Sequence, residues 1–300
     1  MNELFALDAT ELARDRSKWC KALGDRFGFG TGLFVADLEG DFVSRVRAIA
    51  DAQGVDAMEV KRLKELANKA RKEWLLPTEG AHGSDWLEVA LKSRDAGLVE
   101  AIIATDHAHR CYSVEDVLWG DACELLKPRS SALIDTTSED YAKAFKPLIM
   151  KSTEMHLLDR YAFTLSFDKV IERWAEFFDR VQRLSTSAKR ENPSFVLHLW
   201  PQGISNFPGE GHLDAKIQQI NKKLASSASM PLTVKYVLRN DSAPHDRFLW
   251  TVKGAMNLGR GIFLPTDPEQ TYVGYLDAET SKQVYYQYVE AGLKQLSKGP

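Results

Sequence analysis

The amino-acid sequence predicts an α/β fold: a mixed sheet flanked by helices, preceded by a mainly helical N-terminal region. From residue 131 onward, short apolar runs typical of strands alternate with longer segments whose apolar residues recur every three or four positions. Before residue 128 the periodicity is mostly helical. We therefore expect two domains, residues 1–127 and residues 128–300, with Pro128 at the junction.

The clearest helical pattern in the N-terminal region runs from Asp41 to Trp74, where Gly54 separates two helices. Basic residues between 61 and 72 alternate with glutamates, as on a solvated helix face. The glycine-rich stretch 28–32 lacks the spacing of a dinucleotide or P-loop motif, so we interpret it as a connecting loop. Residues 98–104 fit a strand or a helix equally well.

Strands and helices alternate in the C-terminal region. Such crossovers make neighbouring strands parallel, and the carboxyl ends of parallel strands present ligand-binding residues. Asp159 and Arg160 end a strand and are therefore candidates to lie beside a site. The expected strands are 131–135, 154–161, 194–200, 232–238, a strand from 248 and 272–276; the expected helices are 138–149, 167–184, 213–224 and 281–296.

Composition excludes several classes of protein. A hydrophobic fraction of 44% and a charged fraction of 27% are typical of a globular chain, and the net charge of −3 gives no global sign of a nucleic-acid or membrane partner. Three cysteines without metal-ligand spacing favour free thiols in a reducing compartment. The sequence shows no apolar run of membrane-spanning length and no signal peptide, so we expect a cytoplasmic protein.

A histidine pair, His107-x-His109, follows the apolar run 98–104 and has Asp106 beside it. Metal-dependent hydrolases begin their sites in this way, but they need further ligands that His156, His198 and His212, in unrelated contexts, do not supply. We interpret the stretch as a polar loop and expect neither a metal nor a cofactor.

The main candidate site is His245-Asp246-Arg247, which lies between a polar turn and an apolar run from Phe248. If a strand begins at this point, alternation places His245 and Arg247 on one face and Asp246 on the other. An imidazole nucleophile beside a guanidinium anion clamp suits a phosphate group. Further positive charge is available for this pocket from Lys253 and Arg260, and from Lys235 and Arg239.

The same stretch, with Asn257-Leu258-Gly259-Arg260-Gly261, resembles the half-site of the phospholipase D superfamily, in particular its divergent His-Asp-Arg members such as the C-terminal domain of microtubule-interacting-and-trafficking (MIT) proteins. The resemblance covers about residues 130–290 and implies a phospholipase D-like sheet. It implies that His245 is the nucleophile, that Arg247 replaces the family's lysine and that Asn257 matches its asparagine. Val252 stands where the family has an aspartate.

Two functions follow from this resemblance. One is a phosphodiester-processing enzyme, preferably a nuclease, which needs a homodimer because the chain has a single His-x-Arg element and the family mechanism uses two histidines. The other is a non-catalytic module that binds a phosphate ligand, a nucleic acid or a partner protein, alone or in a larger complex. Bacterial antiviral defence suits either function, although no residue argues for it.

Overall fold

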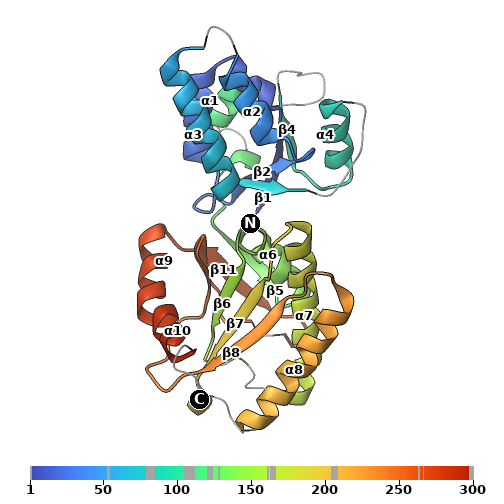
Figure 1. The fold of residues 1–300 in the computed structure, drawn as a ribbon, viewed down its shortest axis with the longest axis vertical. Helices are drawn as coiled ribbons and strands as arrows, with labels where there is room; N and C mark the ends of the chain where they lie inside the picture. Colours follow the sequence, from blue (N-terminus) through green and yellow to red (C-terminus); the bar gives the residue numbers. More distant parts are fainter. Residues whose placement is uncertain are drawn as a thin grey trace. The chain divides into compact units, whose positions relative to one another are not determined.

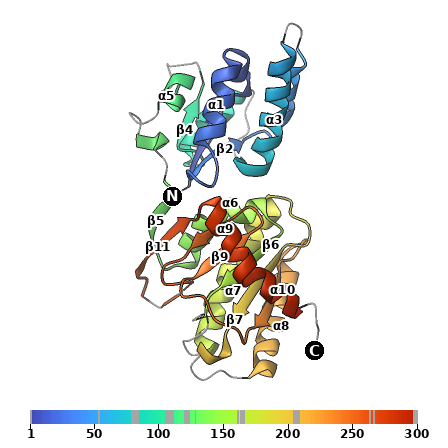
Figure 2. The ribbon, with the colours of Figure 1, turned by 90° about the vertical axis from the view of Figure 1, so that its left-hand side faces the viewer.

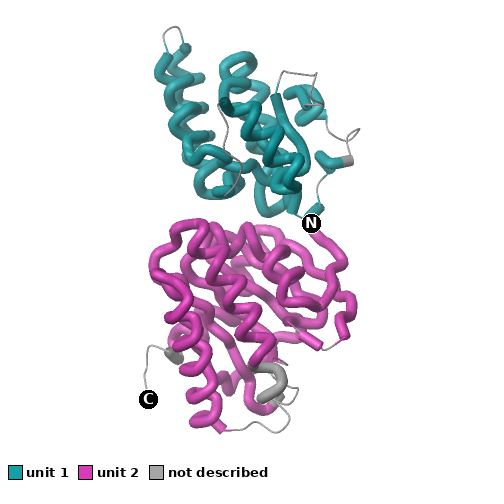
Figure 3. Tube along the Cα trace, turned by 90° about the vertical axis from the view of Figure 1, so that its right-hand side faces the viewer, with its two compact units in different colours: residues 1–130 teal, residues 131–300 magenta. Residues whose placement is uncertain are grey.

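Two compact units, residues 1–130 and 131–300, make up the computed structural model (Figure 3). Each unit contains its own sheet with helices packed on it, so the α/β class is correct. The expected boundary at 127/128 lies three residues before the division at Ser130. The structure describes residues 2–52, 55–78, 85–104, 112–119, 124–127, 129–160, 162, 167–203, 209–262, 264–265 and 267–296.

The N-terminal unit is built on a four-stranded parallel sheet in the order β3-β2-β1-β4 (Figure 1). The strands are β1 (Glu3–Leu7), β2 (Leu33–Asp37), β3 (Leu75–Pro77) and β4 (Ala101–Ile103). Helices make up most of the secondary structure described in this unit, as predicted, but the prediction missed this sheet. All five residues of β1 are buried, and a strand buried on both faces shows no alternation to mark it in a sequence.

Helices connect these strands. The predicted pair between 41 and 74 is confirmed as α2 (Phe42–Ala50) and α3 (Ala57–Glu73), and Asp56 caps α3 by accepting hydrogen bonds from the amides of Met58 and Glu59. The other elements are the 3₁₀ turns η1 (Ala9–Ala13) and η4 (Glu124–Leu126) and the helices α1 (Arg16–Arg26), α4 (Trp86–Asp95) and α5 (Val114–Leu118). The His107-x-His109 stretch lies outside the described residues.

The C-terminal unit contains a mixed seven-stranded sheet in the order β5-β11-β10-β9-β6-β7-β8. Strands β6, β7 and β8 are parallel to one another, and β9 and β11 run antiparallel to their neighbours. Five strands therefore share one direction, and their carboxyl ends meet at one edge. The strands are β5 (Ser131–Asp135), β6 (Glu154–Leu158), β7 (Ser194–Leu199), β8 (Thr233–Leu238), β9 (Phe248–Thr251), β10 (Gly254–Asn257) and β11 (Gln270–Tyr275).

Helices cover both faces of this sheet (Figures 1 and 2). On one face lie the crossover helices α6 (Ser138–Lys151), α7 (Phe167–Ser187) and α8 (Glu210–Ser227). On the other lies the C-terminal helix, made of α9 (Ala278–Val284), a π-helical turn at Tyr285–Val289 and α10 (Glu290–Leu296). Val284 and Val289 pack there against Leu158, Trp200 and Phe248.

The C-terminal elements match the prediction closely, with two exceptions. Strand β10 was not predicted: it lies between the strand expected from Phe248 and the glycine-rich stretch 257–261, and its four residues are too few to show a pattern. The 3₁₀ turn η5 (Pro201–Gly203) follows β7. Among the described residues, no helix has the length and apolar character needed to span a bilayer.

Candidate functional site

The carboxyl edge of the C-terminal sheet is the candidate site. Leu158 at the end of β6 pairs with Phe248 at the start of β9, and Phe248 pairs with Asn257 at the end of β10. This register brings the segments that follow β6 and β10 to the segment that precedes β9. Asp159, the His245–Arg247 segment and the Gly259–Gly261 turn therefore meet at one edge of the sheet, as the sequence predicted for strand ends.

His245 lies in a turn and not in a strand, because β9 begins three residues later at Phe248. Its side chain is 98% exposed, and its Nδ1 lies 3.2 Å from Oδ1 of the neighbouring Asp246. The alternation expected for a strand therefore does not apply. Asp246 is a partner of His245 in the structure, whereas the sequence placed the two side chains on opposite faces.

Arg247 is directed into the fold. Its Nη1 donates a hydrogen bond to the carbonyl of Gly259 at 3.2 Å, and the residue is partly buried. Of the predicted pair, the exposed imidazole faces solvent and the guanidinium holds the turn after β10. The two side chains therefore make different contacts, although both belong to the segment that precedes β9.

Asp159 packs beside Arg247, and Gly261 makes this contact possible. A Cβ atom built on Gly261 would lie 2.0 Å from Asp159 Oδ2 and 3.2 Å from Arg247 Cγ, and the φ of Gly261 is +83°. Asp159 is 2% exposed and accepts a hydrogen bond from the amide of Ile262 at 3.2 Å. Tyr141 donates to the Gly261 carbonyl at 2.7 Å. Asp159 and Arg247 thus fix the turn from below.

Asn257 and Arg260 belong to the same turn. Oδ1 of Asn257 accepts a hydrogen bond from the Gly259 amide at 2.9 Å, so this side chain forms an Asx turn. The Arg260 side chain is 63% exposed and pairs with Glu269. Arg260 is therefore an exposed cation at this edge, and His245 is exposed at the same edge beside Asp246.

The remaining predicted residues lie elsewhere or play other parts. Lys253 lies in the hairpin between β9 and β10, at the opposite edge of the sheet, where its amide donates to Thr251 Oγ1 at 3.1 Å. Its predicted role beside His245 is therefore corrected. Arg160 is partly buried after β6. Arg239 was expected to add surface charge, but its side chain is fully buried.

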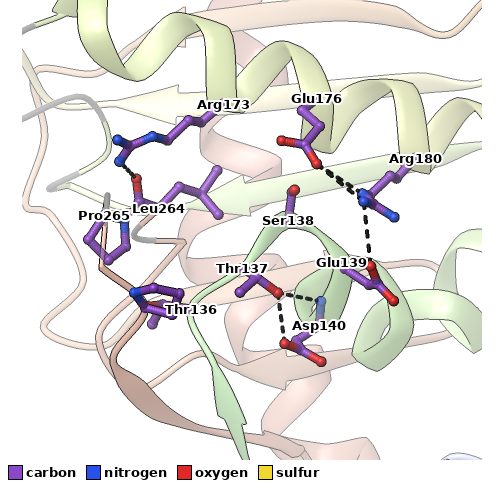
Figure 4. Close-up of a pocket in the computed structure, with 11 residues that line it drawn as sticks. Thr136, Thr137, Ser138, Glu139, Asp140, Arg173, Glu176, Arg180, Leu264 and Pro265 are labelled. Carbon is purple, nitrogen blue, oxygen red and sulfur yellow. Dashed lines mark hydrogen bonds and ion pairs between the residues drawn. The ribbon is translucent and has the colours of Figure 1, made fainter.

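A cavity of about 500 Å³ opens near the same edge, on the face covered by α6 and α7 (Figure 4). The loop after β10 reaches its wall at Leu264 and Pro265. Thr137 caps α6 here, with its Oγ1 3.0 Å from the Asp140 amide and 2.7 Å from Asp140 Oδ2. The sequence predicted only that a helix starts here, and it did not indicate the cavity. The lining residues are Thr136, Thr137, Ser138, Glu139, Asp140, Arg173, Glu176, Arg180, Leu264, Pro265 and Pro268.

The charged groups of this cavity are engaged with each other. Arg180 lies 3.5 Å from Glu139 and 3.2 Å from Glu176, and Arg173 donates to the Leu264 carbonyl. A hydrogen bond from Ser138, aided by Arg180, lowers the pKa of Glu176. An anion entering the cavity would compete with two carboxylates for the Arg180 guanidinium, whereas Arg260 at the exposed edge pairs with Glu269, so we do not assign the phosphate site to the cavity.

A chain of buried polar side chains lies beneath the edge, on the face of the C-terminal helix. His156 Nε2 is 2.9 Å from Glu154 Oε1, and His156 Nδ1 is 3.0 Å from His198 Nε2. His198 Nδ1 is 3.0 Å from Arg239 Nη1, and Arg239 pairs with Asp241. Sequence reasoning left the two histidines in unrelated contexts, because only the pairing of β6 with β7 joins them.

Comparisons with known proteins identify no family. No family model matches the chain, and no curated protein matches it. A solved structure of TrmBL2, an archaeal chromatin protein with a novel mode of DNA binding, is similar over 93% of this chain and 99% of its own chain, at 11% identity. Its TM-score is 0.27, which is too low to support an argument about fold or function.

Proposed function

We propose that the C-terminal unit is a divergent phospholipase D-like module that binds the phosphodiester backbone of a nucleic acid at its carboxyl edge, without hydrolysing it. One observation carries the proposal: the strand register gathers the His245 turn and the Gly259–Gly261 turn at one edge. At that edge the His245 side chain is 98% exposed and that of Arg260 is 63% exposed. Imidazole and guanidinium groups both donate hydrogen bonds to phosphate oxygens.

Three features favour binding over hydrolysis. Each chain offers one histidine at this edge, while the family mechanism needs one nucleophile and one proton donor. Arg247, in the position of the family's lysine, donates to the Gly259 carbonyl. Val252, in the position of its aspartate, lies in the hairpin at the far edge and is 74% exposed. An exposed imidazole and an exposed cation at the same edge are sufficient for binding.

A dimeric nuclease is the second candidate, and the exposure of His245 favours it. A side chain that is 98% exposed is free to meet its copy across a twofold axis, which would bring two imidazoles to one phosphate. In that arrangement one histidine attacks phosphorus and the other protonates the leaving oxygen. Turnover would then depend on dimerisation.

Binding of labelled 20-nucleotide single-stranded DNA, duplex DNA and RNA, measured by fluorescence anisotropy, tests the proposal. Arg260→Gln and His245→Ala should each weaken binding by about threefold to tenfold, the effect of losing one charge-assisted hydrogen bond. Lys253→Gln is the matched control, because it removes one positive charge at the opposite edge of the same sheet. Its affinity should stay within about twofold of the wild type.

Hydrolysis of the same oligonucleotides and of bis(p-nitrophenyl) phosphate separates the two candidates. Binding without turnover supports the module. Turnover that is lost in His245→Ala and that rises with dimer concentration, followed by sedimentation, selects the nuclease. Equal weakening by Arg260→Gln and Lys253→Gln contradicts a site at the carboxyl edge, and absence of binding to all three nucleic acids overturns both candidates.

A further inference from the structure

Arg239 is held by an unusually complete set of partners for a buried arginine. Its Nε donates to Asp241 Oδ1 at 3.0 Å, and its Nη2 pairs with Asp241 Oδ2. Its Nη1 donates to the Tyr288 carbonyl at 2.6 Å and meets His198 Nδ1 at 3.0 Å. The guanidinium carbon also lies 5.3 Å from the centre of the Trp200 ring. A desolvated guanidinium is tolerated only with such complete pairing.

The two buried histidines connect Arg239 to Glu154 in one hydrogen-bond direction. A guanidinium only donates, so His198 Nδ1 must accept and His198 Nε2 must carry the proton. That proton points at His156 Nδ1, which therefore accepts, and His156 Nε2–H then donates to the Glu154 carboxylate. Both imidazoles are consequently neutral Nε2–H tautomers. A second proton on either imidazole would place two hydrogen-bond donors face to face within this series of hydrogen bonds.

The C-terminal helix closes this arrangement. Gly292 of α10 lies against the chain, since a Cβ atom there would be 2.4 Å from His198 Cε1 and 2.8 Å from Arg239 Nη1. The carbonyl of Tyr288, which Arg239 binds, belongs to the π-helical turn. Tyr288 packs on the same apolar cluster as Ala243, two residues before His245, so this helix also lies near the turn that carries His245.

The loop from β8 to β9 depends on Arg239 for its position. Asp241, two residues after Arg239, accepts from Trp200 Nε1 at 3.2 Å as well as from the guanidinium. Ala243 packs on the apolar cluster of the C-terminal helix, and Pro244 is buried. His245 follows immediately. The exposed imidazole therefore projects from a segment that is fixed to the fold by the Asp241 carboxylate and by the packing of Ala243 and Pro244.

We propose that Arg239 is a positioning residue for the nucleic-acid site: through Asp241 and the Tyr288 carbonyl it fixes the His245 turn, and the neutral histidine pair fixes Arg239. This inference rests on the proposed function for its effect on binding. The positioning itself is independent of any ligand. It assigns a role to a buried arginine that does not touch the phosphate.

Amide hydrogen exchange of the full chain tests the positioning without a ligand. Arg239→Lys keeps the charge but loses the fork, and exchange of residues 240–247 should rise by about tenfold or more, as expected when a local anchor is lost. Gln182→Met is the matched control: this buried side chain donates to the Leu224 carbonyl at 3.2 Å and accepts from the Leu232 amide at 2.9 Å, away from the turn. It should raise exchange across the unit without a preference for 240–247.

Asp241→Asn gives a milder second variant, since its side chain is 36% exposed. We expect Asp241→Asn to raise amide exchange in residues 240–247 in the same way, and it replaces Arg239→Lys in the test if that variant does not fold. Oligonucleotide affinity should fall in both variants by about threefold or more, while the Gln182→Met control keeps it. Exchange that rises equally in the control and in either of these two variants overturns the positioning role. A wild type that binds no oligonucleotide overturns the proposed function alone, because the exchange result stands by itself.

Discussion

Each unit contains an aspartate that follows a parallel strand and pairs with an arginine, but the two pairs lie in very different environments. In the N-terminal unit, Asp8 follows β1 and lies 2.9 Å from Arg45, with side-chain exposures of 21% and 26%. In the C-terminal unit, Asp241 follows β8 and pairs with Arg239, whose side chain is 0% exposed. The difference lies in the arginines: the Arg45 guanidinium is partly exposed, whereas the Arg239 guanidinium is enclosed by protein acceptors.

This difference determines what each pair contributes. A partly exposed ion pair contributes little to the free energy of unfolding, because solvent screens the attraction and stabilises either partner alone. A buried arginine cannot lose its acceptors without a large penalty, so it fixes the geometry of every group around it. Arg239 and its partners therefore specify one position for the loop from β8 to β9. The N-terminal pair leaves its neighbourhood free to adjust.

Replacing the two arginines should give the largest difference in unfolding free energy between the two units. Arg239→Met leaves His198 Nδ1 and the Tyr288 carbonyl without their donor, and we expect a loss of about 3–5 kcal/mol from the C-terminal unit. Arg45→Met should cost the N-terminal unit at most about 1 kcal/mol. Urea titrations followed by amide exchange report each unit separately. Similar losses from both substitutions would refute the comparison.

Glycine-to-alanine changes in helices should have opposite signs in the two units. At Gly292 the new methyl group would clash with His198 and Arg239, so we expect a loss of about 1–3 kcal/mol from overpacking. At Gly24 of α1 the nearest atom beyond the helix's own backbone, Lys69 Nζ, would be 3.9 Å from the new methyl group. There the better helix propensity should stabilise the N-terminal unit by about 0.5–1 kcal/mol. Thermal unfolding checks both signs, and a stabilised Gly292→Ala variant would contradict the packing described.

Acid should weaken the C-terminal unit through His198. Burial, together with the charge of Arg239, holds the pKa of this imidazole well below its ordinary value, so it is neutral in the folded chain. The unfolded chain takes up the proton below pH of about 6.5. Stability is therefore fully present above that pH and falls as the pH decreases toward the folded pKa, by at most about 1.4 kcal/mol per pH unit.

His198→Asn provides the comparison for this pH dependence. Asparagine keeps an acceptor and a donor but does not titrate. The variant should show a flatter dependence of unfolding free energy on pH between about 6.5 and 5.5 than the wild type. Chemical denaturation at these two pH values measures the slopes. Identical slopes would mean that His198 is not the group that responds.

Removing Asp8 should have the smallest effect. Its Oδ1 accepts a hydrogen bond from the Thr10 amide at 2.9 Å and pairs with Arg45. Asp8→Ala therefore removes the N-cap of η1 and one partly exposed ion pair. We expect a cost of about 1 kcal/mol to the N-terminal unit, the usual value for such a cap. Denaturant titration measures it. A cost comparable to that of Arg239→Met would show that the N-terminal pair is also a structural anchor.

Much of the C-terminal fold could be predicted from the sequence, because its helices carry wide apolar stripes and clear caps, as at Thr137 of α6. The N-terminal sheet could not. Strands β1 and β2 are almost fully buried and read as short continuous apolar runs, which periodicity does not distinguish from pieces of helix. Helical residues around them then dominated the prediction.

The site was predictable only where strand ends define it. Asp159, Arg247 and Asn257 meet at the expected edge because they flank paired strands. The orientation of His245 relative to Arg247 was not predictable in this way, because alternation holds only inside a strand and β9 begins after both residues. The buried chain was not readable at all: His156, His198 and Arg239 lie 42 and 41 residues apart and meet only through the sheet register.

Titration of ¹⁵N-labelled protein with a 20-nucleotide single-stranded DNA, followed by amide chemical shifts, tests the central claim most directly. The proposed site predicts that the largest changes fall on residues 245–247 and 258–261, at the carboxyl edge of the C-terminal sheet. The hairpin at 252–253 should remain unchanged, since it lies at the opposite edge. Changes confined to that hairpin, to the cavity beside α6 or to the N-terminal unit would contradict the account.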